Sequence, residues 1–539
     1  MCGIWYCLSD FCTAAYASYI AKIQGRGPEQ TQCISLPYGG TLGFNRLAIN
    51  GLNPQGMQPM CNDSGSLYWM CNGEIYNWKE LALQYNISVK SQSDCEVLGE
   101  LYLKLRDSPE DFFKLLDGVF ALVIVDLERK IVVIGRDPYG VRPLYIGDNN
   151  YFSSEMKGLV PLCENVVPFT PGTYRVYSTA STTQLVEEKA YFQIPFLKNP
   201  HYENIMFASM ALRTALESAV SKRMLTERPV ACLLSGGLDS SLIASLVQKN
   251  LRALGLPPLK TFCIGMSGST DVAYARKVAD FIGSDHTEIV LTEDQFFDAI
   301  PEVIRDIESF DTTSVRASVG NWLVSKYIRE HTDCKVVFNG DGSDEVFGSY
   351  MYFYNAPNDF EFESECRRLL KDIHYYDVLR SDRSISSHGL EPRTPFLDRQ
   401  FVQVALSISS TLRRPVKGGK GEDKEGQVEK YLLRRAFDNG ETLPSEVLWR
   451  KKEAFSDGVS SLEKSWYQII QEKIVVPADW KEVVFNYLPP TTPEMYYYRS
   501  IFEKIYGGKR PIPYFWMPRW CVATDPSART LTAYSDNAV

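Results

Sequence analysis

From about residue 205 the chain alternates short apolar runs with segments of helical spacing. Residues 229–234, 261–265 and 335–338 have the composition of buried strands, and residues 242–249 and 271–281 have the apolar spacing of helices. Such alternation predicts a mostly parallel sheet with helices on both faces. Beyond residue 360 the chain is predicted to be mainly helical.

The first of these strands runs into Ser235-Gly236-Gly237-Leu238-Asp239-Ser240-Ser241. Two glycines allow a tight turn whose N–H groups point at an anion, and the helix that follows adds its positive end. The hydroxyls can donate to phosphate oxygens, and Asp239 is placed to hold Mg²⁺. The alternative is a plain Gly-rich turn with a serine cap. No Walker-type Gly-x-x-x-x-Gly-Lys-Ser/Thr loop is present.

Residues 1 to about 190 are instead predicted to be rich in strands. Short apolar runs at 67–71, 119–126 and 130–134 are separated by Gly, Pro, Asn and Asp, which is typical of a β-sandwich with a few helices, one near 95–105. The polar stretch around 178–201 loses this rhythm and is the predicted linker. We therefore expect domains at 2–190 and 206–539, joined by residues 191–205.

Length, charge and cysteine spacing exclude several functional classes. A chain of 539 residues is too long for one core, and a net charge of −9 without a basic block argues against nucleic-acid binding. The 13 cysteines are scattered, without CxxC spacing, which argues against a zinc site. No leader-like N-terminus and no apolar run of roughly 18 residues is present. These features predict a soluble, cytoplasmic protein with free thiols that binds neither nucleic acid nor membrane.

Cys2 directly follows the initiator methionine. If Met1 is removed, one residue carries both a thiol, with a reference pKa of roughly 8.5, and an α-amine, with one of roughly 7.7–8. The amine is then a base beside the nucleophile, as in enzymes with an N-terminal threonine. The alternative is a buried or incidental cysteine.

Three other groups match the needs of an amidohydrolase that uses Cys2. Asn72-Gly73 offers a side-chain amide and an unhindered N–H for an oxyanion, and Arg46 can grip a carboxylate in bidentate fashion. Asp94 can bind an ammonium group. Each alone could be a turn or surface residue, but together they match the carboxylate, ammonium and amide of one glutamine.

These motifs resemble those of a known family. The order Cys2-Gly3-Ile4, Arg26-Gly27-Pro28, Arg46-Leu47, Asn72-Gly73-Glu74 and Ser93-Asp94 resembles a class II, Ntn-type glutaminase domain. The loop at 235–241 resembles the PP-loop of ATP pyrophosphatases. With the motifs at 313–318, 342–345, 389–391, 395–398, 449–458 and 523–532, the chain resembles the glutamine-hydrolysing asparagine synthetases, and the last two motifs look most like the eukaryotic branch.

The resemblance implies a fold and a reaction. The fold is a two-domain combination of α+β and α/β parts: an N-terminal Ntn-type α-β-β-α sandwich, then a parallel α/β sheet of adenine nucleotide α-hydrolase type with helical additions. The reaction is an ATP-dependent carbon–nitrogen ligation. Glutamine, aspartate, ATP and water would become asparagine, glutamate, AMP and pyrophosphate, through a Cys2 thioester and β-aspartyl-AMP. Ammonia would pass between the sites along a dry path, ATP would be used with Mg²⁺, and the enzyme would be a homodimer.

The resemblance also implies roles for residues. Cys2 would be the nucleophile and Asn72 and Gly73 the oxyanion donors, with glutamine held by Arg46, Leu47, Ala48, Ile49, Asn50, Glu74 and Asp94. The ATP site would comprise Leu233, Ser235, Gly236, Gly237, Asp239, Ser240, Ile264, Asn339 and Gly340. Aspartate and its intermediate would contact Thr313, Ser314, Arg316 and Asp344, while Asp239 and Asp344 approach the metal. Arg316, Asp341 and Lys452 would act at the reacting centre.

Several positions depart from the family pattern. Asn339-Gly340-Asp341 stands where Ser-Gly-Glu is usual, so the carboxylate thought to take a proton from ammonia lies one methylene, about 1.5 Å, further back. We therefore expect a slower or water-mediated second half-reaction with intact glutamine hydrolysis. Gly25, Glu29 and Ser349 are read as tolerated loop variation.

Competing functions remain at this stage. Another acyl-adenylating amidotransferase is possible, although relatives of β-lactam synthetase lack the nucleophilic cysteine that this chain keeps. Phosphoribosyl amidotransferases lack the Ser235–Ser241 loop and are excluded. A pseudoenzyme or regulatory binding protein is suggested only by Asn339 and Asp341.

Overall fold

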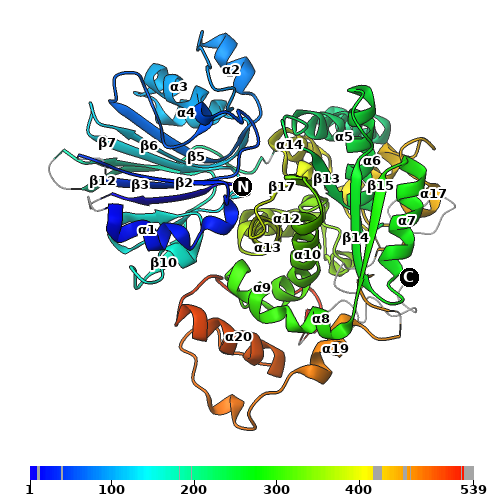
Figure 1. The fold of residues 1–539 in the computed structure, drawn as a ribbon. Coiled ribbons are helices and arrows are strands. Elements are labelled where there is room, and N and C mark those ends of the chain that lie inside the picture. The colour runs from blue at the N-terminus through cyan, green and yellow to red at the C-terminus, as the bar shows by residue number, and fades with distance from the viewer. Residues whose placement is uncertain are drawn as a thin grey trace.

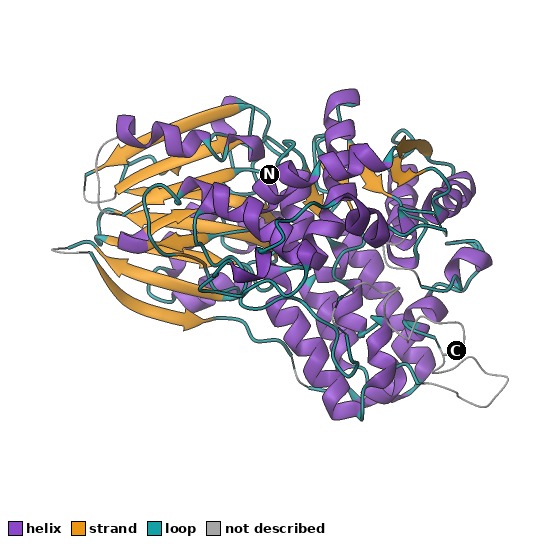
Figure 2. Cartoon of the chain, turned by 90° about the horizontal axis from the view of Figure 1, so that it is seen from below, coloured by secondary structure: helices purple, strands orange, loops and turns teal. Residues whose placement is uncertain are grey.

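The computed structural model describes residues 1–8, 13–37, 40–180, 183–195, 197–416, 428–452, 458–461, 463–523 and 525–526. Residues 453–457 of the motif at 449–458, and residues 524 and 527–532 of the motif at 523–532, lie outside the described residues. Most strands lie at one end of the molecule and most helices at the other (Figure 2).

Two six-stranded sheets form the N-terminal part. The first has the order β10-β8-β9-β1-β3-β2 and the second β12-β11-β7-β6-β5-β4, with antiparallel pairing throughout. The strands are β1 Gly3–Cys7, β2 Gln30–Leu36, β3 Gly40–Arg46, β4 Met60–Cys61, β5 Leu67–Ile75, β6 Gly118–Asp126, β7 Ile131–Arg136, β8 Tyr145–Gly147, β9 Tyr151–Ser153, β10 Val166–Pro168, β11 Thr173–Ser178 and β12 Gln184–Ala190.

Helices cover the outer faces of both sheets. They are α1 Thr13–Ala21 on one side, and α2 Trp78–Gln84, α3 Val97–Leu105 and α4 Pro109–Leu115 on the other (Figure 1). Buried side chains such as Phe44, Phe152 and Val123 fill the space between the sheets, because alternate residues of each strand point to one face. The α-β-β-α sandwich is confirmed.

The second part is built on a parallel sheet with the strand order β15-β14-β13-β16-β17. Its strands are β13 Val230–Leu233, β14 Lys260–Met266, β15 Asp285–Leu291, β16 Val336–Phe338 and β17 Glu391–Arg393. The helices are α5 Ile205–Lys222, α6 Leu238–Ala253, α7 Thr270–Ile282, α8 Glu293–Asp298, α9 Ile300–Ile307, α10 Thr312–His331, α11 Ser343–Phe347, α12 Asp359–Asp372, α13 Asp377–Ser386, α14 Arg399–Ser407, α15 Ser410–Arg413, α16 Tyr431–Ala436, α17 Ser445–Leu448, α19 Trp466–Lys473 and α20 Pro493–Tyr506. The predicted parallel sheet with helical additions is confirmed.

The sequence reading was wrong about one strand. Residues 184–190, read as part of a polar linker, form the edge strand β12, which pairs with β11. Most of its side chains are exposed on both faces, so it lacks the apolar alternation of a half-buried strand. The domain boundaries at 190 and 206 stay a prediction.

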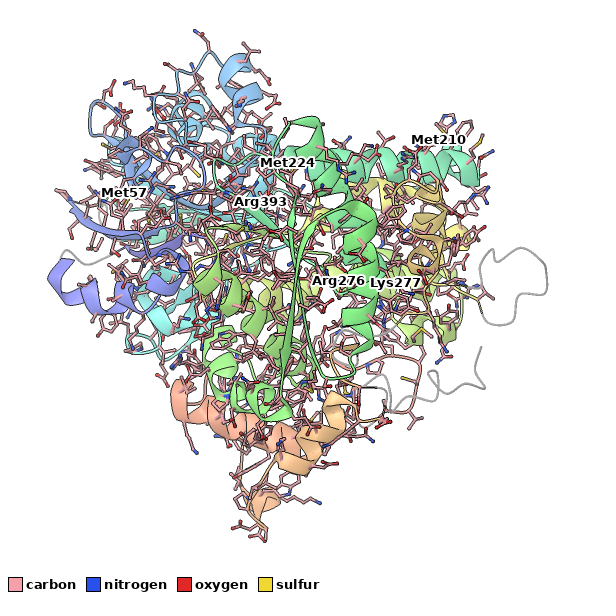
Figure 3. The ribbon with its side chains drawn as sticks, turned by 45° about the vertical axis from the view of Figure 1, so that its right-hand side comes forward. Met57, Met210, Met224, Arg276, Lys277 and Arg393 are labelled. Atoms are coloured by element: carbon pink, nitrogen blue, oxygen red, sulfur yellow. The ribbon has the colours of Figure 1, made fainter. Side chains whose placement is uncertain are left out.

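Buried ion pairs and hydrogen bonds join the two parts. Arg26 of the first part pairs with Asp382 of the second, and Glu308 accepts from the N–H groups of Met156 and Lys157 at 2.8 and 2.7 Å. Arg393, which lies at this junction in Figure 3, comes within 3.6 Å of Glu74.

A helix that crosses a membrane must be both long enough and apolar enough. None of the helices within the described ranges meets both requirements.

Candidate active sites

Strand pairing positions Cys2. β1 runs antiparallel to β3 with Gly3 opposite Asn45, so Cys2 lies beside the end of β3. Its Sγ is 3.5 Å from both the nitrogen and the oxygen of Leu47. The Cys2 carbonyl accepts a hydrogen bond from Arg26 Nε at 3.0 Å. The thiol is therefore fixed at the carboxyl end of β3, where Arg46 also emerges.

One small cavity collects the predicted glutamine-binding groups around Cys2. Its wall includes Arg46, Leu47, Ala48, Ile49, Asn50, Gly73, Glu74 and Asp94. Asn72 is the exception: it is fully buried behind this wall, with Nδ2 3.5 Å from Ser154 Oγ, and its Oδ1 has no hydrogen-bond partner in the part of the chain that the structure describes. Gly73 thus lies in the wall, whereas the Asn72 amide must turn to reach an oxyanion.

Glu74 and Asp94 are buried carboxylates in the wall of this cavity. Burial and the neighbouring Asp94 raise the pKa of Glu74 well above its usual value, and burial raises the pKa of Asp94 to about 6. Asp94 accepts from Ile75 N at 2.7 Å, and Glu74 accepts from Asn50 Nδ2 at 2.8 Å. A bound ammonium would relieve this repulsion, because an opposite charge favours the ionised form of both acids.

The initiator methionine occupies the space next to the thiol. Met1 is buried, and its ammonium group donates to Leu390 O at 3.4 Å. Burial lowers the pKa of this amine to about 6 and raises the pKa of the Cys2 thiol to about 11. In this unprocessed form Cys2 has no free α-amine, so the predicted chemistry requires removal of Met1.

The second site begins at the turn after β13. Gly236 adopts a positive φ of 72°, and a Cβ there would lie 2.5 Å from Ala275 N, so glycine alone fits. Ser235 and Ser240 hydroxyls are 3.0 Å apart, and Ser240 Oγ also receives Ser235 N–H at 3.2 Å. The turn is therefore closed on itself at the start of α6.

Parallel pairing places a second loop beside this turn. β16 neighbours β13, so the residues after Phe338 emerge at the same sheet edge. A Cβ on Gly340 would lie 2.8 Å from Asp239 Cβ, which shows how closely the loops approach. The resulting cleft is lined by the predicted residues Leu233, Ser235, Gly237, Asp239, Ser240, Ile264, Thr313, Ser314, Asn339, Gly340, Asp341, Asp344 and Lys452. Gly236 is not in this lining because it faces α7.

Two aspartates of the cleft converge on one positive charge. Lys430 Nζ lies 2.5 Å from Asp239 Oδ2 and 2.6 Å from Asp344 Oδ1, and Lys452 also pairs with Asp344. Burial alone would raise the pKa of Asp344, but the two lysines hold it far below its usual range. Asp239 and Asp344 thus present oxygen ligands to a single cation position, which fits Mg²⁺.

Asp341 projects into the same cleft and is tied to α13. Arg380 Nη2 is 3.0 Å from Asp341 Oδ1 and also pairs with Asp377, whereas Asp341 Oδ2 is buried with no hydrogen-bond partner among the described residues. Burial raises the pKa of Asp341, while the Arg380 charge opposes the rise. One oxygen of this carboxylate is therefore held, and the other is available to a proton.

Arg316 lies elsewhere. Its guanidinium is bound by two buried carboxylates, at 2.6 Å by Glu494 and at 2.7 Å by Asp525, and it stacks over Tyr467. It is not in the lining of the cleft that holds Thr313 and Ser314. Its predicted contact with aspartate requires release from these partners.

Sequence reasoning missed Lys430, Arg380 and Asp377. A signal for Lys430 existed: it stands at the N-terminal end of α16, where a cation is unfavourable because the helix dipole is positive there. Arg380 and Asp377 carried no signal, since charged residues on a helix are usually solvated.

Comparisons with known proteins agree with this geometry. Residues 1–214 match the glutamine amidotransferase domain family, and residues 211–365 and 356–521 match the asparagine synthase family. Asparagine synthetase [glutamine-hydrolyzing] of Gallus gallus is 41% identical, covering 99% of both chains, and that of Homo sapiens is 40% identical over the same shares. The Cricetulus griseus protein of that name is 40% identical over 100% of both chains. This chain therefore belongs to the glutamine-hydrolysing asparagine synthetase family.

Proposed function

We propose that the protein moves the amide nitrogen of glutamine to the side chain of aspartate, converting ATP to AMP and pyrophosphate. The observation that carries the proposal is the cavity in which Cys2 faces Arg46, Glu74 and Asp94. A carboxylate, an ammonium and an amide can each find a partner there. The relatives bear the name of this activity, and they match the chain over its length.

The first half-reaction uses Cys2 as nucleophile. Its thiolate attacks the glutamine side-chain carbonyl, a thioester forms, ammonia leaves, and water then releases glutamate. The Gly73 N–H and the Asn72 amide would stabilise the oxyanion. The α-amine exposed by removal of Met1 would take and return the proton.

The second half-reaction takes place in the cleft at the sheet edge. The aspartate side chain attacks the α-phosphorus of ATP, which gives β-aspartyl-AMP and pyrophosphate. Ser235, Gly237 and Ser240 would hold phosphate oxygens, with Lys430 and Lys452 supplying positive charge. Ammonia then attacks the acyl carbon of the adenylate, the acyl–phosphate bond breaks, and AMP leaves as asparagine forms. Oδ2 of Asp341 would accept the proton that the attacking nitrogen loses.

Mg²⁺ is the cation that we propose for Asp239 and Asp344. Among the described residues no group of three or more His, Cys, Asp or Glu side chains is arranged to hold a metal. Mg²⁺ would therefore depend on these two carboxylates together with ATP phosphates, as it does in other nucleotide sites. When bound, the ion would neutralise charge on the leaving pyrophosphate.

A cytoplasmic location and a homodimer complete the proposal. The twelve cysteines that the structure describes are all free, which suits a reducing compartment. The dimer is proposed from the family resemblance, and light scattering of the purified protein measures it.

Cys2→Ala should abolish glutamine-dependent asparagine formation and glutamate release. Ammonium salts should still support asparagine formation, because the cleft is untouched. Aspartate-dependent pyrophosphate release, followed with each nitrogen source, is the measurement. A wild-type protein that releases no pyrophosphate with aspartate would instead indicate a pseudoenzyme.

Glutamine binding should weaken as the pH falls. Burial raises the pKa of Asp94 to about 6, so the carboxylate that pairs with the substrate ammonium is ionised above that pH and neutral below it. KM for glutamine, measured from glutamate release between pH 5 and 8, should rise below about pH 6. Asp94→Asn should have a high KM that changes much less over this range; a wild-type KM that is flat across pH 6 contradicts the assignment.

Asp341→Glu should raise the yield of asparagine per glutamate released. The added methylene carries the carboxylate about 1.5 Å further toward the adenylate, which restores the reach of the usual glutamate. Product ratios at saturating substrates test this, with Asp341→Asn as the control that lowers the yield further while glutamate release continues. If the wild type forms one asparagine per glutamate released at an undiminished rate of asparagine formation, the shorter side chain of Asp341 does not slow the second half-reaction, and the prediction is wrong.

A further inference from the structure

Helix α13 contacts both candidate sites. Near its start, Arg380 holds Asp341 at 3.0 Å, and Ser381 Oγ accepts from Asn339 Nδ2 at 2.7 Å. The next residue, Asp382, reaches across the domain boundary to Arg26. A helix of ten residues therefore carries side chains that touch the synthetase cleft and the neighbourhood of Cys2.

The pair of Arg26 and Asp382 has the geometry of a strong, oriented contact. Arg26 Nη1 donates to Asp382 Oδ2 at 2.7 Å and Nη2 donates to Oδ1 at 3.1 Å, so the pairing is bidentate. Both residues are buried. Burial would raise the pKa of Asp382, but Arg26 and Arg383 lower it to about 2. The carboxylate is thus charged and fixes the plane of the guanidinium.

The same guanidinium touches the nucleophile. Arg26 Nε donates to the main-chain oxygen of Cys2 at 3.0 Å, while Nη1 also reaches Glu155 and Ser386. Once Met1 is removed, Cys2 has no chain before it, and β1 begins only at Gly3. The hydrogen bond from Arg26 is therefore one of few restraints on the Cys2 main chain.

We propose that Asp382 is a positioning residue for glutamine hydrolysis, acting through Arg26 on the main chain of Cys2, and that α13 makes this positioning depend on occupancy of the synthetase cleft. The inference rests on the proposed function, in which Cys2 cleaves glutamine. Substrates that engage Asp341 or Arg380 would act on the same short helix that carries Asp382, which would link the two halves of the reaction mechanically.

The first test is the glutaminase reaction of Asp382→Asn. The neutral amide accepts from Arg26 on one side only, so we expect kcat for glutamate release to fall about tenfold to a hundredfold, because small displacements of a reacting group are costly. KM for glutamine should change little, since Arg46, Glu74 and Asp94 are untouched. An unchanged kcat in a folded variant overturns the positioning role.

A matched variant distinguishes an effect on the position of Cys2 from a general weakening of the contact between the domains. Glu308→Gln removes an equally buried carboxylate at the same boundary, one that binds the N–H groups of Met156 and Lys157. Within the part of the chain that the structure describes, Glu308 makes no hydrogen bond or ion pair with Cys2 or Arg26. It should lower the melting temperature as Asp382→Asn does and keep the wild-type kcat. Equal loss of kcat in both variants overturns the proposal. If Asp382→Asn does not fold, Asp382→Glu keeps the charge pair and should show an intermediate kcat at normal melting temperature.

The second test measures how far ligands in the synthetase cleft change the rate of glutamine hydrolysis. Glutamate release by the wild type is compared with and without aspartate plus a non-cleavable ATP analogue, and kcat should differ about fivefold or more. In Asp382→Asn the two values should coincide. No difference in the wild type, or the same difference in both proteins, overturns the link. Absence of glutamate release from the wild type would instead count against the proposed function itself.

Discussion

Buried charges at the domain boundary fix the two sites relative to each other. Removing an ion from water costs several kcal/mol, and good pairing geometry is needed to offset it. Here Arg26 and Arg142 of the first part lie 2.7 and 3.8 Å from Asp382 of the second part. Within the first part Arg26 also pairs with Glu155, and within the second part Arg383 pairs with Glu308. All six residues are buried. Separating the domains would take Arg26 and Arg142 away from Asp382, so these buried pairs favour the docked arrangement.

As a consequence, residues only a few positions apart in the chain contact the glutaminase cavity and the synthetase cleft. β17 is three residues long: Glu391 at its start lies in the wall of the Cys2 cavity, and the Arg393 carbonyl at its end accepts from Asn339 N at 3.1 Å. β17 and α13 therefore run side by side from one site toward the other. Ammonia in water at neutral pH is mostly ammonium, which is not a nucleophile, so a buried route between such sites has a chemical purpose.

Much of this arrangement could be predicted because it depends on local patterns. Strands that end in glycine-containing loops specified the cleft, and Cys2 with Arg46, Glu74 and Asp94 specified the cavity. Residues whose roles depend on pairing with partners distant in the sequence could not be predicted in this way. Arg380, Asp377 and Asp382 look like ordinary polar residues of a helix until the fold buries Asp382 and brings Arg380 and Asp377 to the cleft. The strand β12 was not predicted because an exposed edge strand needs no apolar face. Arg316 was expected in the cleft, and only the structure reveals Glu494 and Asp525 as its partners.

We propose that nitrogen released at Cys2 reaches the adenylated aspartate without entering solvent, as the family resemblance implies. Glutamine labelled with ¹⁵N in its amide, incubated with aspartate, ATP and an excess of unlabelled ammonium at pH 7, tests it through the mass of the asparagine formed. We expect asparagine that keeps the ¹⁵N label at a ratio far above that of the mixed ammonium pool. Asparagine whose isotope ratio equals that of the pool would contradict the account.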